Sequence, residues 1–197
     1  MNYSIYAEST PNPQVMKFVA NRMLADKSIE ISNLKEAKGI SIAEELLKFP
    51  FIQSIYLSAN FISITKNKTI EWEDIAMHLR SFITEHLNSS NDIKNYTEHI
   101  DVRKEKHSEK GKIVNTSKKF NPLEKEIEAI LNEYIAPAVE ADGGAITLNY
   151  YKDNIVCVDL KGACSGCPSS TSTLKGGIEN LLKQKINPEI EVIANEK

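Results

Sequence analysis

Hydrophobic and polar residues form regular patterns in two parts of this chain and not in a third. Over residues 1–88 and 120–197, hydrophobic residues recur with the spacing of strands and helices. Residues 89–119 contain 13 charged residues among 31 and only six hydrophobic ones, and such a segment cannot bury enough apolar surface to fold alone. The pattern predicts two small α+β domains, residues 1–88 and 120–197, joined by a charged flexible linker, residues 89–119.

The first domain is expected to contain five strands and two helices. Short runs rich in β-branched and aromatic residues predict the strands, and apolar residues at helical spacing predict the helices. The strands are expected at residues 4–8, 15–21, 29–33, 51–58 and 61–66, and the helices at residues 41–49 and 72–87. The second helix is expected to bury one side, formed by Trp72, Ile75, Ala76, Leu79, Phe82, Ile83 and Leu87.

The second domain is expected to have the order helix, hairpin, loop, helix and strand. Asn121, Pro122 and Glu124 are the residue types of an N-cap, a first-turn proline and a capping box, so a helix should begin there. Pro137 is expected to bend or end this helix. Its apolar side is expected to comprise Leu123, Ile127, Ile130, Leu131, Tyr134 and Ile135. The hairpin strands are expected at residues 145–151 and 154–160, and the second helix at residues 171–186.

Charge differs between the predicted parts of the chain. By count of acidic and basic residues, residues 1–88 carry −1, residues 89–119 carry +3 and residues 120–197 carry −5, which agrees with the net charge of −3. Nucleic-acid binding relies on basic surfaces that neutralise phosphates. The acidic second domain therefore argues against a nucleic-acid partner.

The pattern of apolar residues also bears on location. No apolar run in the 197 residues approaches the length of a membrane span, so no membrane partner is expected. Residues 1–14 show neither a basic segment followed by an apolar core nor an arginine-rich amphipathic pattern. Three cysteines also suit a reducing compartment. We therefore expect a cytoplasmic protein.

The segment with the clearest chemistry is KGACSGCPSSTS at residues 161–172. Cys164 and Cys167 are separated by two residues on a glycine-containing loop, between a predicted strand and a predicted helix. Four thiolates are the usual shell of an iron–sulfur cluster or a structural zinc ion, and this chain has only three cysteines. We therefore expect two chains to share one metal centre through Cys164 and Cys167.

The third cysteine is expected to have a structural role. Cys157 alternates with Val156 and Val158 on a predicted strand, as packed strand residues do. Other interpretations of the Cys164 and Cys167 pair stay open. A thioredoxin-like dithiol oxidoreductase also has C-x-x-C at a helix N-terminus, although only 30 residues follow Cys167. A structural zinc-bridged dimer needs the same four thiolates, so spacing alone does not exclude it.

The helix after the loop has two further features. Its N-cap is expected within the serine- and threonine-rich run at residues 169–172, and a helix N-terminus favours thiolate over thiol. Gly176 and Gly177 in the helix interior should together cost about 2 kcal/mol relative to alanine. We expect either the sheet beneath or a partner chain to require the close approach that glycine allows.

In both predicted domains the sequence resembles a known family, the NifU-like iron–sulfur carrier proteins of the Nfu type. The second domain has P-x-V-x-x-D-G-G at residues 137–144 and LKGACSGCPSSTSTLKGGIE at residues 160–179. The first domain resembles the N-terminal domain of such scaffolds through TPNP at residues 10–13 and the Lys17–Phe18 pair. The resemblance covers nearly all of residues 1–88 and 120–197, and the linker matches nothing.

This resemblance implies a carrier and not an enzyme. The family's members hold a [4Fe-4S] cluster between two subunits and transfer it to apo-proteins. Cys164 and Cys167 correspond to the family's ligand pair, and Cys157 corresponds to no ligand. The partners implied are a second copy of the chain, upstream cluster-assembly proteins and apo client proteins.

Overall fold

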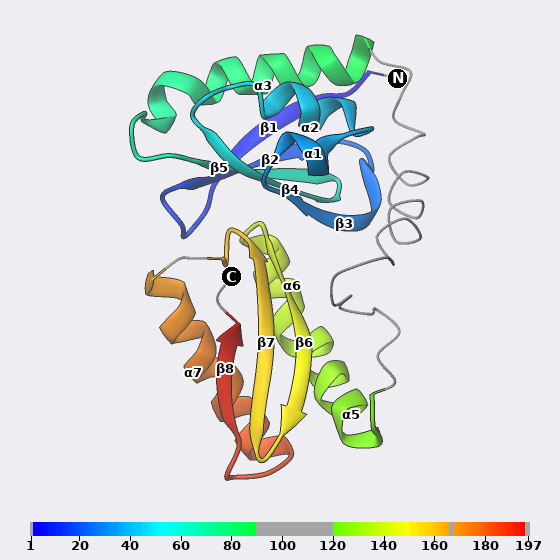
Figure 1. The fold of residues 1–197 in the computed structure, drawn as a ribbon, viewed down its shortest axis with the longest axis vertical. Coiled ribbons are helices and arrows are strands. Elements are labelled where there is room, and N and C mark those ends of the chain that lie inside the picture. Colours follow the sequence, from blue (N-terminus) through cyan, green and yellow to red (C-terminus); the bar gives the residue numbers. More distant parts are fainter. Residues whose placement is uncertain (1, 90–119, 166–167, 196–197) are drawn as a thin grey trace. The chain divides into compact units, whose positions relative to one another are not determined.

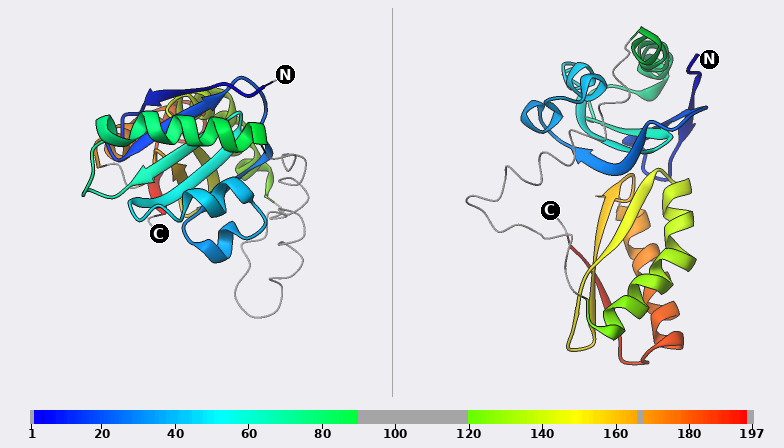
Figure 2. Two further views of the ribbon diagram at one scale, coloured as in Figure 1. Left: turned by 90° about the horizontal axis from the view of Figure 1, so that it is seen from above. Right: turned by 90° about the vertical axis from the view of Figure 1, so that its right-hand side faces the viewer.

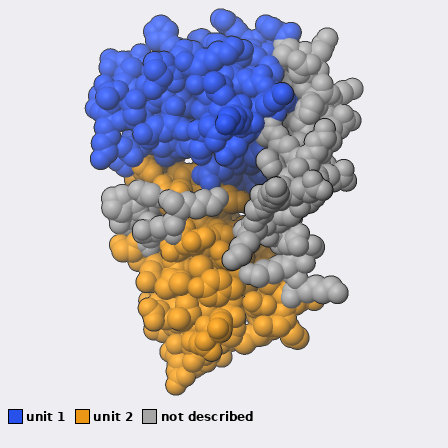
Figure 3. Space-filling model, in the orientation of Figure 1, with its two compact units in different colours: residues 1–9, 13–116 blue, residues 10–12, 117–197 orange. Residues whose placement is uncertain are grey.

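The structure is a computed structural model that describes residues 2–89, 120–165 and 168–195. The chain divides into two compact units, one formed by residues 1–9 and 13–116 and the other by residues 10–12 and 117–197 (Figure 3). Each unit combines a sheet with helices (Figure 1), which confirms the predicted α+β class. Residues 90–119, nearly all of the predicted linker, lie outside the described residues.

The first unit is built on a five-stranded antiparallel sheet with the strand order β1-β2-β5-β4-β3. The strands are β1 (Ile5–Ser9), β2 (Val15–Ala20), β3 (Ala25–Ile31), β4 (Ile52–Ala59) and β5 (Phe61–Lys66). All five predicted strands are therefore present. Strand β3 begins four residues earlier than predicted, because its first half, Ala25 to Ser28, is mostly polar and exposed on an edge strand.

Three helices lie on one face of this sheet (Figure 2). They are α1 (Leu34–Ala37), α2 (Ser41–Leu46) and α3 (Trp72–Ser89). Helix α1 was not predicted, because four residues are too few to show a helical period. Its first turn is held by Asn33, whose side chain accepts hydrogen bonds from the backbone N–H groups of Lys35 and Glu36 at 3.1 and 3.0 Å.

The apolar core of the first unit lies between the sheet and these helices. Helix α3 buries the predicted side chains, with five buried and Ala76 and Phe82 partly buried against them. They pack with sheet residues such as Phe18, Ile62 and Ile64. At the C-terminal end of α3, the side chain of Asn88 accepts from the backbone N–H of Tyr3 at 2.7 Å and donates to its carbonyl at 3.0 Å. The C-terminal end of the helix is therefore fixed to the segment just before β1.

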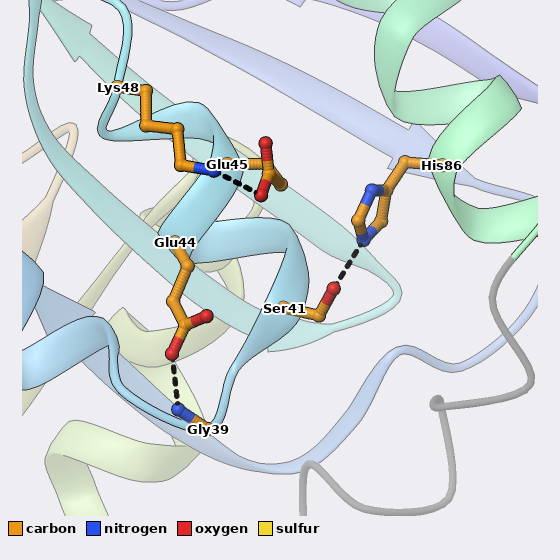
Figure 4. Close-up of polar contacts among 6 residues, drawn as sticks. All are labelled: Gly39, Ser41, Glu44, Glu45, Lys48 and His86. Carbon is orange, nitrogen blue, oxygen red and sulfur yellow. Dashed lines mark hydrogen bonds and ion pairs between the residues drawn. The ribbon is translucent and has the colours of Figure 1, made fainter.

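Polar contacts connect helix α2 to helix α3 and to the turn that precedes α2 (Figure 4). The Ser41 hydroxyl and the Nε2 atom of His86 lie 2.9 Å apart, which links α2 to α3. The backbone N–H of Gly39, a residue with φ of 86°, donates to Glu44 at 2.7 Å. Only glycine adopts such a φ without strain. His86 is therefore part of a helix-to-helix contact.

The second unit has the predicted order of helix, hairpin, loop, helix and strand. Its elements are α5 (Pro122–Ile130), the π-helical turn η2 (Leu131–Ile135), α6 (Ala136–Ala141), β6 (Gly144–Lys152), β7 (Ile155–Gly162), α7 (Pro168–Lys185) and β8 (Glu191–Asn195). Strand β7 lies in the middle of the sheet, antiparallel to β6 and parallel to β8. The helices lie on one face of this sheet (Figure 2).

The first helical segment of this unit begins as predicted. The Asn121 side chain accepts from the backbone N–H of Glu124 at 2.8 Å, and the Glu124 side chain accepts from the backbone N–H of Asn121 at 2.9 Å. Pro137 lies in the first turn of α6, directly after the π-helical turn. The π turn changes the spacing of the backbone hydrogen bonds, which accommodates a proline within the helical segment. Tyr134, predicted on the apolar side, lies within this π turn and is 47% exposed, because the wider turn changes the helical spacing on which the prediction relied.

A two-residue turn joins β6 to β7. Asp153 and Asn154 both have positive φ, 52° and 62°, as a type I′ hairpin turn requires. The apolar core of the unit lies between the sheet and the helices and comprises Ile127, Leu131, Val139, Ile146, Leu148, Val156, Val158, Cys164, Ile178, Leu182, Ile190 and Val192. One candidate metal ligand, Cys164, is thus a member of this core.

Candidate metal centre

The loop that carries the candidate ligands follows the end of β7. Strand β7 ends at Gly162, whose φ of 61° turns the chain away from the sheet. The backbone N–H of Ala163 donates to the carbonyl of Gly143 at 3.2 Å, and that of Ser165 donates to Gly162 at 3.1 Å. These bonds fix the loop on both sides of Cys164. Cys167 lies outside the described residues.

The glycine pair after α6 lies directly against this loop. Gly143 has φ of 83°, and its backbone N–H donates to Glu140 at 3.0 Å, which ends the helix. Gly144 begins β6 and is paired with Gly162 in the antiparallel ladder. The two motifs that carried the family resemblance, far apart in the sequence, therefore meet at one end of the sheet.

Cys164 is held in a narrow space at this end. The residue is 5% exposed and belongs to the apolar core. A Cβ atom added to Gly144 would lie 2.8 Å from the Cys164 sulfur, 2.7 Å from the backbone oxygen of Lys161 and 3.1 Å from the backbone nitrogen of Cys164. The sulfur therefore occupies space that only glycine at position 144 leaves open. In the sequence, Gly144 was visible only as the last residue of the P-x-V-x-x-D-G-G motif.

Cys157 lies elsewhere in the unit, as predicted. It is 4% exposed on β7, between Val156 and Val158, and unlike them it is outside the core beneath the helices. Its neighbour in the ladder is Tyr150. The negative charge of the Cys157 thiolate raises the pKa of the Tyr150 hydroxyl, and burial and the hydrogen bond to Cys157 act in the same direction.

The distance along the strand separates Cys157 from the candidate ligands. Gly162, where the loop begins, is five residues beyond Cys157, which is roughly 17 Å in an extended strand. In the part of the chain that the structure describes, no group of three or more His, Cys, Asp or Glu side chains could hold a metal ion. Within one chain, the described site thus offers a single thiol, Cys164.

For the helix after the loop, one expectation needs correction and another is narrowed. Helix α7 begins at Pro168, before the serine and threonine residues that were expected to cap it. A proline is favoured at the first helical position, which explains this earlier start. A Cβ added to Gly176 or Gly177 would meet no described atom within 4 Å, so the sheet beneath does not require these glycines.

Among the described residues, no helix has the length and apolar character of a membrane span.

Comparison with protein families gives a match in each half of the chain. A model described as "Scaffold protein Nfu/NifU N terminal" matches residues 5–90. A model described as "NifU-like domain" matches residues 127–193. The second match includes the loop with Cys164 and Cys167, together with Gly143 and Gly144.

Comparison with individual proteins gives relatives over nearly the whole chain. "NifU-like protein, mitochondrial" of Saccharomyces cerevisiae is 31% identical over 201 residues, covering 94% of this chain and 77% of the yeast protein. "NFU1 iron-sulfur cluster scaffold homolog, mitochondrial" of Homo sapiens is 28% identical over 189 residues, covering 95% of this chain and 69% of the human protein. For "NifU-like protein 4, mitochondrial" of Arabidopsis thaliana, with 26% identity, 93% of this chain matches 62% of the plant protein.

A solved structure, the solution NMR structure of a NifU-like protein from Saccharomyces cerevisiae, matches with a TM-score of 0.41 and 26% sequence identity. The match covers 45% of this chain and 82% of that chain. A TM-score of this size supports no inference on the fold.

The cytoplasmic location predicted from the sequence is wrong. The relatives from yeast, human and Arabidopsis are all named as mitochondrial proteins. The prediction depended on the lack of a recognisable targeting signal, and such a lack does not identify a compartment.

The evidence for the family comes from both halves of the chain. The two family models match 5–90 and 127–193, and a relative with 31% identity matches over 94% of the chain. The motifs around Gly144 and Cys164 that suggested the family lie inside the second match. The chain therefore belongs to the Nfu-type family of NifU-like iron–sulfur cluster scaffold proteins, with an Nfu/NifU N-terminal domain followed by a NifU-like domain.

Proposed function

We propose that this protein binds a [4Fe-4S] cluster between two copies of the chain and transfers it to apo-proteins without acting as an enzyme. The observation that carries the proposal is the position of Cys164. Its sulfur lies where two glycine-containing turns meet, at the end of the sheet and just before helix α7. The human relative is named as an iron–sulfur cluster scaffold homolog, which agrees with a thiol site that holds a cluster.

The ligands in this proposal are Cys164 and Cys167 of each chain. Thiolates are the ligands that iron–sulfur clusters require, and one chain has two in its loop. Cys157 cannot complete the shell, since it lies roughly 17 Å along β7 from the loop and is outside the apolar core that contains Cys164. Two loops supply four thiolates, so we infer a homodimer around the cluster.

The transfer step follows from this ligand set. Because each chain contributes only two thiolates, a client protein can replace them one at a time. In each exchange a client thiolate forms an Fe–S bond, a Cys164 or Cys167 thiolate leaves, and the iron and sulfide keep their oxidation states. The cluster is the cargo, and the partners are upstream cluster-assembly proteins and apo clients. We infer a mitochondrial setting from the names of the relatives.

A measurement of iron, sulfide and mass on protein reconstituted without oxygen tests the proposal. We expect about four iron and four sulfide per two chains, a dimer mass and brown colour, whereas the apo-protein should be mostly monomeric. Four iron on a monomer would contradict the shared site. A colourless dimer that contains zinc would favour the structural zinc alternative.

The first domain is proposed to recruit clients. It has its own apolar core, and no candidate ligand lies in it. A fragment of residues 120–197 should therefore bind the cluster and show the same absorption spectrum as the full chain. It should transfer the cluster more slowly to a protein client but equally fast to a small chelator, because a tethered client-binding domain raises the local client concentration. Equal client transfer by fragment and full chain would contradict this role.

A further inference from the structure

The contact between Gly144 and Cys164 is closer than a turn requires. Gly143 provides the positive φ that ends α6, so a second glycine is not needed for the change of direction. Gly144 has another constraint, because a Cβ there would lie 2.8 Å from the Cys164 sulfur. Carbon and sulfur atoms that are not bonded lie farther apart than this in stable structures. Position 144 therefore constrains where the sulfur lies.

The backbone on both sides of this contact is fixed. Gly144 is paired with Gly162 in the β6–β7 ladder, and a Cβ at 144 would also lie 2.7 Å from the backbone oxygen of Lys161. The loop is further held by the bond from the Ala163 N–H to the Gly143 carbonyl at 3.2 Å. A methyl group at position 144 could therefore be accommodated only if the Cys164 side chain or the end of β7 moved.

We propose that Gly144 is a positioning residue for the ligand Cys164. The missing side chain at position 144 forms a seat for the sulfur, which fixes the direction of the thiol and shelters it in the metal-free protein. Gly144 itself touches no cluster and acts only through Cys164. The part of this inference that concerns the cluster rests on the proposed function, whereas the shelter of the thiol is a property of the apo-protein and is tested without a cluster.

The first test measures the reactivity of Cys164 in the apo-protein. Iodoacetamide alkylates a thiolate with loss of iodide, and mass spectrometry of digested protein resolves Cys164 from the other two cysteines. In folded wild type, Cys164 should react roughly a hundredfold more slowly than in urea, because a sheltered thiol reacts only when its surroundings open. Equal rates in folded and urea-treated wild type would overturn the proposal without any variant.

The Gly144→Ala variant should expose the same thiol. Its added methyl displaces the sulfur, so Cys164 should be alkylated roughly tenfold faster or more than in wild type, in line with its greater exposure. Gly176→Ala is the matched control, because it makes the same change where no described atom lies within 4 Å. Its Cys164 should react at the wild-type rate. An unchanged rate in folded Gly144→Ala would overturn the proposal.

A double-mutant cycle separates the sulfur contact from a general effect on the fold. Gly144→Ala should lower the melting temperature of the apo-protein, and the decrease should be smaller when Cys164→Ala has already removed the sulfur. A decrease of equal size in both backgrounds would show that the methyl group meets only the backbone. It would contradict the proposal that Gly144 positions the Cys164 sulfur. If Gly144→Ala does not fold, recovery of folding in the double variant still tests the contact.

The final test uses the loaded protein. After reconstitution, Gly144→Ala should lose iron to a chelator roughly tenfold faster than wild type, with an altered visible circular dichroism spectrum, since the ligand is misplaced. If wild type binds no cluster but shelters Cys164, the proposed function fails and the seat stands. If wild type binds the cluster and Gly144→Ala matches it in both alkylation and iron loss, the seat fails and the proposed function stands.

Discussion

The two units of this protein use their apolar cores differently. In the first unit the core lies between a five-stranded sheet and three helices and contains no candidate ligand. In the second unit the core lies against a three-stranded sheet, and the candidate ligand Cys164 is one of its buried members. The core of the first unit therefore has a role in packing alone, whereas the core of the second unit also contains a candidate metal ligand.

The glycines show the same contrast. Gly39 in the first unit provides a turn with φ of 86° and a hydrogen bond to Glu44. In the second unit, Gly143 also provides a turn, but its neighbour Gly144 leaves room for the sulfur of Cys164. Changes to the backbone near the loop should thus affect stability and metal binding together. Changes to the core of the first unit should affect the stability of that unit and leave metal binding unchanged.

The largest expected effect is the loss of a ligand. Cys164→Ser should abolish the cluster, because the change removes two of four ligands in a symmetric dimer, and Cys167→Ser should do the same. Cys157→Ser is the matched control and should keep the cluster. Absorption at visible wavelengths and iron content of anaerobically reconstituted protein measure this. A folded Cys157→Ser variant without colour would contradict the ligand assignment.

Truncation of a core side chain in each unit tests this difference. It should change the stability of that unit alone, and it should affect metal binding only in the second unit. Leu79 of α3 and Leu182 of α7 are both fully buried, so each change to alanine should destabilise its own unit by about 2–5 kcal/mol. Trp72, the one tryptophan in the sequence, reports on the first unit by fluorescence. Leu79→Ala should shift the fluorescence transition in urea, and Leu182→Ala should leave it unchanged.

The same two variants should differ in metal binding. Leu182→Ala should also speed the loss of iron to a chelator, because its unit contains the ligand loop. Leu79→Ala should leave that rate at the wild-type value. If Leu79→Ala speeds the loss of iron as much as Leu182→Ala does, the two units do not behave separately.

Local patterns in the sequence predicted most of the fold. The buried side of α3 was visible because its seven apolar residues recur at helical spacing, and the start of α5 was visible because Asn121 and Glu124 form a capping box. The short helix α1 and the polar start of β3 were not predicted, since neither has an apolar period. The π-helical turn was also missed, and with it the exposure of Tyr134.

The candidate site could be predicted only in part. The spacing of Cys164 and Cys167 indicated a thiolate pair, and the strand pattern around Cys157 indicated a structural thiol. The contact of Gly144 with Cys164 joins residues that are 20 positions apart, and it depends on the register in which Gly144 pairs with Gly162. A single sequence shows two adjacent glycines but not which of them faces a sulfur.

A smaller effect is expected from Glu179, which forms an ion pair within α7 and a hydrogen bond to β8. Glu179 accepts from Lys183 at 2.7 Å and from the backbone N–H of Val192 at 3.1 Å, and these bonds hold the pKa of its carboxyl below the ordinary value. A lowered pKa in the folded state stabilises the fold above the ordinary pKa of the carboxyl, and this contribution is lost as the pH falls through the folded pKa.

The corresponding variant is Glu179→Gln. It should be less stable than wild type at pH 7, and the difference should shrink as the pH is lowered below the ordinary range of glutamate. Urea unfolding followed by circular dichroism at several pH values measures this, with the transition of Trp72 as an internal control for the first unit. A difference that stays constant from neutral to acidic pH would contradict the assigned role of the carboxylate.

The smallest effect is expected at Gly176 and Gly177, and its sign is opposite to that at Gly144. No described atom lies within 4 Å of a Cβ added at either position, so alanine should fit and raise the stability of the apo-protein by about 1 kcal/mol per site, through the better helix propensity of alanine. Urea unfolding of the two single variants measures this gain. The measurement also tests the second reason for glycine in this helix, close approach by a partner chain. If that reason holds, the alanine variants should be more stable as monomers but should form fewer dimers on reconstitution. If dimer formation is unchanged, the requirement for glycine in this unit is confined to the turns and to Gly144 beside Cys164. Alanine should then lower the stability of the apo-protein at Gly144 and raise it at Gly176 and Gly177.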